Sequence, residues 1–112
     1  MKISIPKETT LDETRVAATP QSVKELIKAG YEVSIETGAG TSSFISDDDF
    51  KNAGAKIVNT SNELFKDSDI IIKVAPPTSD EIESMPKDSI LVSFFQPTIE
   101  LEKVKSISIK NI

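Results

Sequence analysis

The sequence predicts an α/β fold with a doubly wound, mainly parallel sheet of the flavodoxin or Rossmann-like kind. Short apolar runs alternate along the chain with segments that carry helix-capping signals. Two of these runs, at residues 70–74 and 89–95, are largely apolar rather than alternating, which is typical of strands buried on both faces of a sheet. The 112 residues allow one domain, and no internal repeat or linker divides them.

The strands follow in order from these patterns. We expect them at residues 2–5, 31–36, 55–58, 70–74, 89–95 and 106–112. Residues 2–5 alternate polar and apolar side chains and end at Pro6, which predicts a short, half-buried strand. The two largely apolar runs should lie at the centre of the sheet. The run at 106–112 alternates again with nothing after it to pair with, so we expect the domain to be C-terminally incomplete.

Capping signals place helical segments between these strands. We expect them at residues 20–29, 46–53, 60–65 and 98–104, while residues 78–85 form either one acidic turn or a short helix. The first begins with Thr19 as its cap and Pro20 at its first position, and Gly30 supplies a left-handed stop. Ser46 caps the second. Right-handed crossovers through such helices would complete a doubly wound sheet.

The composition excludes several classes of chemistry. The chain has no Cys and no His, which removes disulfides, thiolate nucleophiles, His-dependent triads and nearly every zinc site. Its 13 basic and 18 acidic residues give a formal charge of −5, and aromatic residues make up 5%, so no nucleic-acid partner is expected. Neither a secretory signal nor a membrane span is visible, which predicts a cytoplasmic chain. Attachment to a membrane through another subunit stays open.

Two motifs resemble ligand sites but have simpler structural explanations. Gly38 and Gly40 follow a predicted strand, yet the third glycine of a dinucleotide-binding loop is missing and the next helix starts too late, which favours a structural turn. The run 47–49 is entirely Asp and could suggest a metal site. Carboxylates at a helix N-terminus complement the helix dipole, however, and the Gly and closing Glu of a calcium loop are absent. We therefore assign no metal-binding, cofactor-binding or catalytic residue.

Three polar residues follow predicted strands and are candidates for a substrate or anion pocket. Ligands of open parallel sheets bind beyond the carboxyl ends of the strands, and Arg15, Lys73 and Gln96 all project from such ends. Arg15 and Lys73 could hold a carboxylate or phosphate, with Gln96 donating from its amide. The alternatives are an ion pair of Arg15 with Glu8, Asp12 or Glu13, and a Lys73 side chain that reaches solvent.

The motifs, taken in order, resemble one family. They are Met1–Glu8, Glu13–Pro20, Gly38–Gly40, Ala53–Ala55, Ile72–Val74 with Pro76, and Leu91–Phe94. Together they resemble the N-terminal domain shared by alanine dehydrogenases and the α subunit of proton-translocating NAD(P) transhydrogenase. The resemblance covers nearly the whole chain.

Within that family, the resemblance favours transhydrogenase. In alanine dehydrogenases the position matching Gln96 is a histidine that handles protons on the substrate, and the residues matching Arg15 and Lys73 hold the carboxylate of pyruvate. Glutamine cannot titrate, so it cannot act as that general acid or base. Transhydrogenation passes a hydride directly between two nicotinamides and needs no such proton transfer.

The resemblance also implies what the complete enzyme contains. Residues 1–112 would be part of the N-terminal domain, with the NAD-binding Rossmann domain absent from this chain. NAD and NADP would serve the complete enzyme, while the isolated chain would bind neither and would be inactive. The expected partners are the rest of the α subunit, the membrane and NADP-binding components and a second α subunit, with the chain peripheral to the inner membrane. An alanine dehydrogenase-type fragment and a stand-alone, non-enzymatic binding module remain as alternatives.

Overall fold

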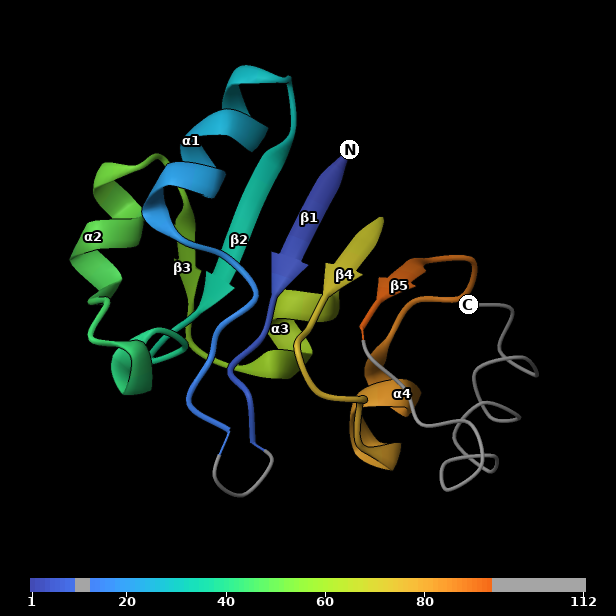
Figure 1. Ribbon diagram of the computed structural model, residues 1–112. Helices are drawn as coiled ribbons and strands as arrows, with labels where there is room; N and C mark the ends of the chain where they lie inside the picture. Colours follow the sequence, from blue (N-terminus) through green and yellow to red (C-terminus); the bar gives the residue numbers. More distant parts are fainter. Residues whose placement is uncertain (10–12, 94–112) are drawn as a thin grey trace.

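A computed structural model describes residues 1–9 and 13–93, which build one parallel sheet with helices on both of its faces (Figure 1). The strands are β1 (Lys2–Ile5), β2 (Glu32–Glu36), β3 (Lys56–Val58), β4 (Ile70–Ile72) and β5 (Ile90–Val92). The helices are α1 (Pro20–Lys28), the 3-10 turn η1 (Thr41–Ser43), α2 (Asp47–Asn52), α3 (Ser61–Phe65) and α4 (Ser79–Ser84). The helix and strand expected at 98–104 and 106–112 lie outside the described residues.

The strand order is β3-β2-β1-β4-β5, and every pair is parallel. The chain runs from β1 through α1 to β2 and through α2 to β3, at one edge of the described sheet. It then returns through α3 to β4, on the other side of β1, and through α4 to β5. Right-handed crossovers in opposite directions place the two helix pairs on opposite faces of the sheet. The predicted doubly wound α/β fold is confirmed.

The face under α1 and α2 holds the larger core, and the face under α3 and α4 holds the smaller one. Aliphatic side chains of β1 and β2 pack in the first core with one residue from each covering helix, namely Ile3, Ile5, Val33, Ile35, Val23 and Phe50. The second core contains Leu64, Phe65, Ile71 and Met85. Two small cores agree with the modest apolar content of 38%.

The centre of the described sheet is β1, and β5 lies at one end. Ile90 and Val92 of β5 are 50% and 52% exposed, because no described helix covers them on the face that α1 and α2 cover elsewhere (Figure 1). An apolar run therefore does not by itself identify a central strand. The expectation that residues 2–5 are half-buried is also wrong: Ser4 is fully buried, and its hydroxyl lies within hydrogen-bond distance of Leu64 O (3.0 Å) and of the Ser68 hydroxyl.

The predicted capping residues act as expected. The Thr19 and Ser46 hydroxyls each accept the backbone N–H three residues later, and each helix has a reciprocal capping box. Gly30 has a φ of 100°, as its role as a left-handed stop requires. The turn after η1 instead places Phe44 in the left-handed region, with a φ of 61° and its side chain 97% exposed.

No helix among the described residues is long and apolar enough to cross a membrane.

Candidate functional site

A buried charged cluster forms where β1 and β4 end. Lys73 directly follows β4, and its ammonium Nζ lies 3.3 Å from Glu8 Oε1 and 3.4 Å from Glu81 Oε2. The three side chains are 1%, 2% and 11% exposed, respectively. Glu8 comes from the loop after β1 and Glu81 from α4, so the cluster connects both elements to the end of β4. Two carboxylates against one ammonium give the cluster a formal charge of −1.

Glu8 also fixes the backbone that leaves β4. Its Oε2 accepts a hydrogen bond from the N–H of Val74 at 3.0 Å, and its Oε1 accepts one from the N–H of Ala75 at 3.0 Å. These donors stabilise the buried carboxylate without removing its charge. Anionic partners therefore replace water around the Lys73 ammonium, and the side chain does not extend to solvent. The ammonium already has two carboxylate acceptors, those of Glu8 and Glu81.

Arg15 lies in a separate ion pair. Its Nε and Nη2 donate to the two oxygens of Glu13, each at 2.9 Å, and the Arg15 side chain is 69% exposed. Hydrogen bonding to the Arg15 guanidinium lowers the pKa of Glu13 to about 2, and the same contact raises the pKa of Arg15. The alternative in which Arg15 pairs with a neighbouring carboxylate is confirmed, with Glu13 as the partner.

A cleft of about 340 Å³ opens beside the charged cluster, at the carboxyl ends of β4 and β5. Its walls are mainly aliphatic, and it is lined by Val16, Ala17, Ile72, Lys73, Val74, Val92 and Ser93. The Ser93 Oγ is buried and has no hydrogen-bond partner among the described residues. Among the described residues that line the cleft, Lys73 alone is charged.

The structure thus brings only part of the predicted pocket together. Lys73 and Val16 both line the cleft, and Val16 directly follows Arg15 in the sequence. The Arg15 side chain, however, pairs with Glu13 and is not among the residues that line the cleft. Gln96 lies outside the described residues. Sequence reasoning missed Glu8 and Glu81 as partners of Lys73. A lysine in an apolar run does indicate an anionic partner. The sequence did not identify that partner, because Glu8 lies 65 positions from Lys73 in the chain.

The glycine turn and the aspartate run have structural roles in the described part of the chain. Asp47 accepts hydrogen bonds from the Thr37 hydroxyl (2.6 Å) and the Gly38 N–H (2.9 Å), and these bonds lower the pKa of Asp47. A side chain at Gly40 would lie 2.6 Å from Ile45 O, so this glycine is required by a close approach. Residues 1–9 and 13–93 contain no group of three or more acidic side chains able to hold a metal ion.

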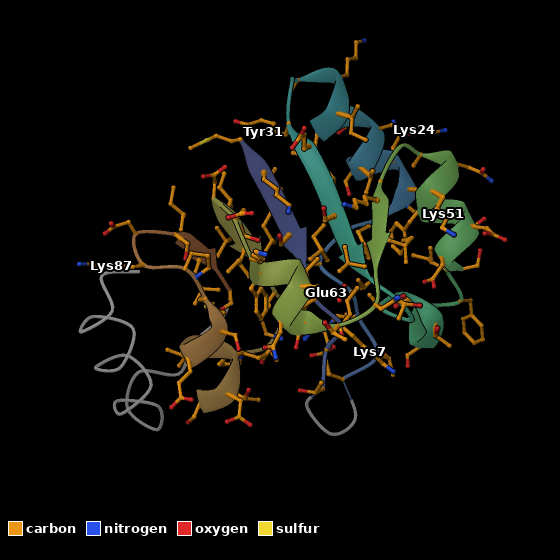
Figure 2. The ribbon with its side chains drawn as sticks, turned by 180° about the vertical axis from the view of Figure 1, so that it is seen from behind. Lys7, Lys24, Tyr31, Lys51, Glu63 and Lys87 are labelled. Atoms are coloured by element: carbon orange, nitrogen blue, oxygen red, sulfur yellow. The ribbon has the colours of Figure 1, made fainter. Side chains whose placement is uncertain are left out.

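The described lining of the cleft includes one basic side chain, that of Lys73. Figure 2 shows Lys24, Lys51 and Lys87 on the outside of the fold, pointing into solvent from separate parts of the chain.

The family described as "Alanine dehydrogenase/PNT, N-terminal domain" matches residues 4–112. An alanine dehydrogenase of Mycobacterium tuberculosis is 44% identical over 94 residues, which cover 84% of this chain and 25% of that protein. The NAD(P) transhydrogenase subunit alpha of Haemophilus influenzae is 42% identical over 112 residues, which cover 100% of this chain and 22% of that protein.

Solved structures show the same two similarities. The transhydrogenase from Sinorhizobium meliloti superposes with a TM-score of 0.94 at 30% identity, over 99% of this chain and 33% of that one. An L-alanine dehydrogenase superposes with a TM-score of 0.90 at 33% identity, over 96% of this chain and 29% of that one. The chain therefore spans between 22% and 33% of the length of these four relatives.

Proposed function

Because the chain belongs to the alanine dehydrogenase/PNT N-terminal domain family, we propose that it is the N-terminal part of an NAD(P) transhydrogenase α subunit. The complete enzyme would transfer a hydride from NADH to NADP and couple this transfer to proton translocation. The proposed partners are the rest of the α subunit, including an NAD-binding Rossmann domain, a second α subunit, and the membrane and NADP-binding components. The chain would then be cytoplasmic and peripheral to the inner membrane.

One observation carries this proposal: the described residues that line the cleft offer no free group for proton transfer to an organic substrate. The chain has no histidine, and Gln96 stands where the resemblance to alanine dehydrogenases calls for one. Among the described residues that line the cleft, only Lys73 can titrate, and two carboxylates hold its ammonium. Direct hydride transfer between nucleotides needs no such group, whereas oxidative deamination does.

In this proposal the chain supplies position rather than reactive groups. The hydride chemistry belongs to NAD and NADP, and the protein must orient them and exclude water. The Glu8 and Lys73 contacts hold the backbone after β4, so the residues at the rim of the cleft have fixed positions. The isolated chain should bind neither nucleotide appreciably, and micromolar affinity for NADH would contradict this expectation.

The test compares two reactions of the polypeptide that carries this chain, assembled with the membrane and NADP-binding components. We expect NADH-dependent reduction of NADP, and no consumption of NADH with pyruvate and ammonium. The variant Gln96→His should leave hydride transfer between the nucleotides largely intact. Reductive amination of pyruvate by the unchanged protein, at a rate similar to nucleotide reduction, would refute the proposal.

An alanine dehydrogenase-type protein is the second candidate, supported by 44% identity to an enzyme of that name. This candidate needs the anion pocket of Arg15, Lys73 and Gln96. To bind a carboxylate together, Arg15 would have to leave Glu13, and Lys73 would have to release at least one of its carboxylates. Replacing Arg15 and Lys73 with Ala should abolish any anion-dependent rise in the melting temperature if this pocket exists.

A stand-alone, non-enzymatic module is the third candidate, and protein mass distinguishes it from the others. An antibody against this chain should detect a polypeptide several times heavier than 12.2 kDa in the source cells if the chain is part of a longer subunit. A band at 12.2 kDa would favour the module.

A further inference from the structure

We propose that a notch at the amino ends of β1, β2 and β3 binds a small organic carboxylate, with its head at Ser34 and Lys56 and a short apolar tail against Ile27. The notch lies at the other end of the sheet from the cleft described above. Figure 2 shows Tyr31, just before β2, at the opposite end of the fold from Lys7, which follows β1. The proposed function uses none of the residues that line the notch, so the two proposals are tested separately.

The notch exists because β2 extends past the start of its neighbour β3. The two strands pair only from Ser34 onwards, where Lys56 is the register partner, so Glu32 and Val33 have no partner on β3. The cavity at this point has a volume of about 370 Å³, near the lower end of the roughly 300–1,000 Å³ typical of small-molecule sites. This volume is enough for a carboxylate with a short carbon chain.

Ser34 supplies a buried hydroxyl that is available to a ligand. The residue is 3% exposed and lines the cavity, and its hydroxyl has no hydrogen-bond partner among the described residues. Its register partner on β1, Ser4, is also buried, but the Ser4 hydroxyl donates to Leu64 O at 3.0 Å. Because buried polar groups in folded proteins nearly always have a partner, the Ser34 hydroxyl is a donor that a bound carboxylate would satisfy.

Two lysines line the notch together with this hydroxyl. Side chains that are in register on neighbouring strands share a face of the sheet, so Lys56 lies beside Ser34, and Lys2 lies on the same face at the start of β1. Neither ammonium has a carboxylate partner among the described residues, and Lys2 Nζ donates to Lys66 O at 3.3 Å. Glu32 also lines the notch, which leaves its described lining with a formal charge of +1 in a chain of net charge −5.

The remaining neighbours of the notch favour a single negative charge with an apolar tail. The Asp69 carboxylate accepts the backbone N–H of Lys2 at 2.8 Å and offsets part of the positive charge, so a carboxylate is better matched than a doubly charged phosphate monoester. Ile27 and Tyr31 line the notch as well, and both pack against the larger core. They provide apolar contacts for a short carbon chain, while the carboxylate accepts from the hydroxyl and from an ammonium.

The experiment compares probes of similar length and different charge on the 112-residue chain. Butyrate, butyramide, butylammonium and butyl phosphate are titrated at constant ionic strength, and the NMR signals of Ser34, Gly54 and Lys56, which line the notch, are followed. We expect butyrate to bind about fivefold more tightly than neutral butyramide, since one unit charge near a protein surface has an effect of this order. Butyl phosphate should bind no more tightly than butyrate, and butylammonium should leave these signals unshifted.

Three variants assign the effect to particular groups. Ser34→Ala should weaken butyrate binding severalfold without lowering the urea midpoint of unfolding, because the hydroxyl has no described partner to lose. Lys56→Gln should remove most of the preference for butyrate over butyramide. Lys24→Gln is the matched control, because it removes the same charge from an exposed position on α1 that points into solvent, and it should leave the preference unaltered (Figure 2).

Three outcomes would overturn the inference. The first is equal affinity for butyrate and butyramide, and the second is an equal loss of butyrate binding in Lys56→Gln and Lys24→Gln. The third is an absence of shifts at the notch up to the solubility of the probes, which would mean that the cavity holds only water. None of these outcomes decides the proposed function, which depends on nucleotide reduction by the assembled enzyme.

Discussion

Replacing Glu8 with Ala should destabilise the chain more than any other change of a single charged residue near the cleft. The carboxylate of Glu8 is 2% exposed and has three partners: the ammonium of Lys73 and the N–H groups of Val74 and Ala75. Ala removes all three contacts at once. Glu81 lies 3.4 Å from the Lys73 ammonium and remains as its ion-pair partner, but it can offset only part of the cost of burying that ammonium.

The size of the effect follows from these contacts. A buried donor left without a partner costs about 1–3 kcal/mol, and breaking a buried ion pair by removing one partner costs about 3–5 kcal/mol. Because Val74 is only half-buried and Glu81 still faces Lys73, we expect the low end of each range. The low ends, about 1 kcal/mol for each of the two N–H donors and about 3 kcal/mol for the ion pair, sum to about 5 kcal/mol, which equals the lower end of the roughly 5–15 kcal/mol that stabilises a typical domain.

The assay is equilibrium unfolding in urea, followed by circular dichroism because the chain has no Trp. Glu8→Gln keeps an oxygen that can accept from the backbone and should cost about 1–2 kcal/mol, so it stays measurable if Glu8→Ala does not fold. Glu25→Ala is the control, since Glu25 is a glutamate on α1 that is exposed to solvent, and its replacement should change the free energy of unfolding by less than about 0.5 kcal/mol.

A double-mutant cycle isolates the ion pair. Lys73→Met should be strongly destabilising alone and less so when Glu8→Gln is already present, with a coupling of about 1–3 kcal/mol. A cost below about 1 kcal/mol for Glu8→Ala, or additive effects in the cycle, would refute the reasoning.

Three further changes test other parts of the structure. Arg15→Ala should raise the pKa of Glu13 from about 2 toward its ordinary value of 4.5, measured by NMR titration of the carboxyl carbon; an unchanged pKa would exclude the pair in solution. Asp47→Asn should lower the melting temperature at neutral pH, and the difference should vanish in acid, because a carboxyl whose folded pKa is depressed stabilises the fold above its unfolded pKa and loses this effect as pH falls. Phe44→Gly should stabilise the chain by about 0.5–1 kcal/mol, since the left-handed backbone is strained for Phe and the ring is exposed; a lower urea midpoint would show that the ring packs.

Much of the fold was predictable because its signals are local. Thr19, Pro20 and Gly30 define a helix within a dozen residues of one another, and the structure places α1 between them. The position of β1 was not predictable in this way. Its neighbour β4 begins at Ile70, and which strands pair over such a distance depends on the packing of the whole chain.

The candidate site shows the same division. The sequence identified Lys73 as a lysine that needs an anion, and it identified Arg15 together with its alternative partner. It could not show that Glu8 and Glu81 would supply the anions, because the chain contains 18 acidic residues and only the fold selects two of them. The sequence also could not show that the Ser93 hydroxyl is buried without a hydrogen-bond partner among the described residues, since burial depends on the fold.

The central place of β1 also determines the order in which the protein can fold. Because β1 is synthesised before β2 and β4, it can pair with β2 early, but its other edge stays unpaired until β4 has been made. Lys2 and Asp69, which join these edges, are 67 positions apart. Contacts between such distant residues slow folding, because the loop must close before they form. An exposed β1 edge during synthesis is a site where nascent chains can associate, so a pause in translation before residue 70 would lower the yield of folded protein.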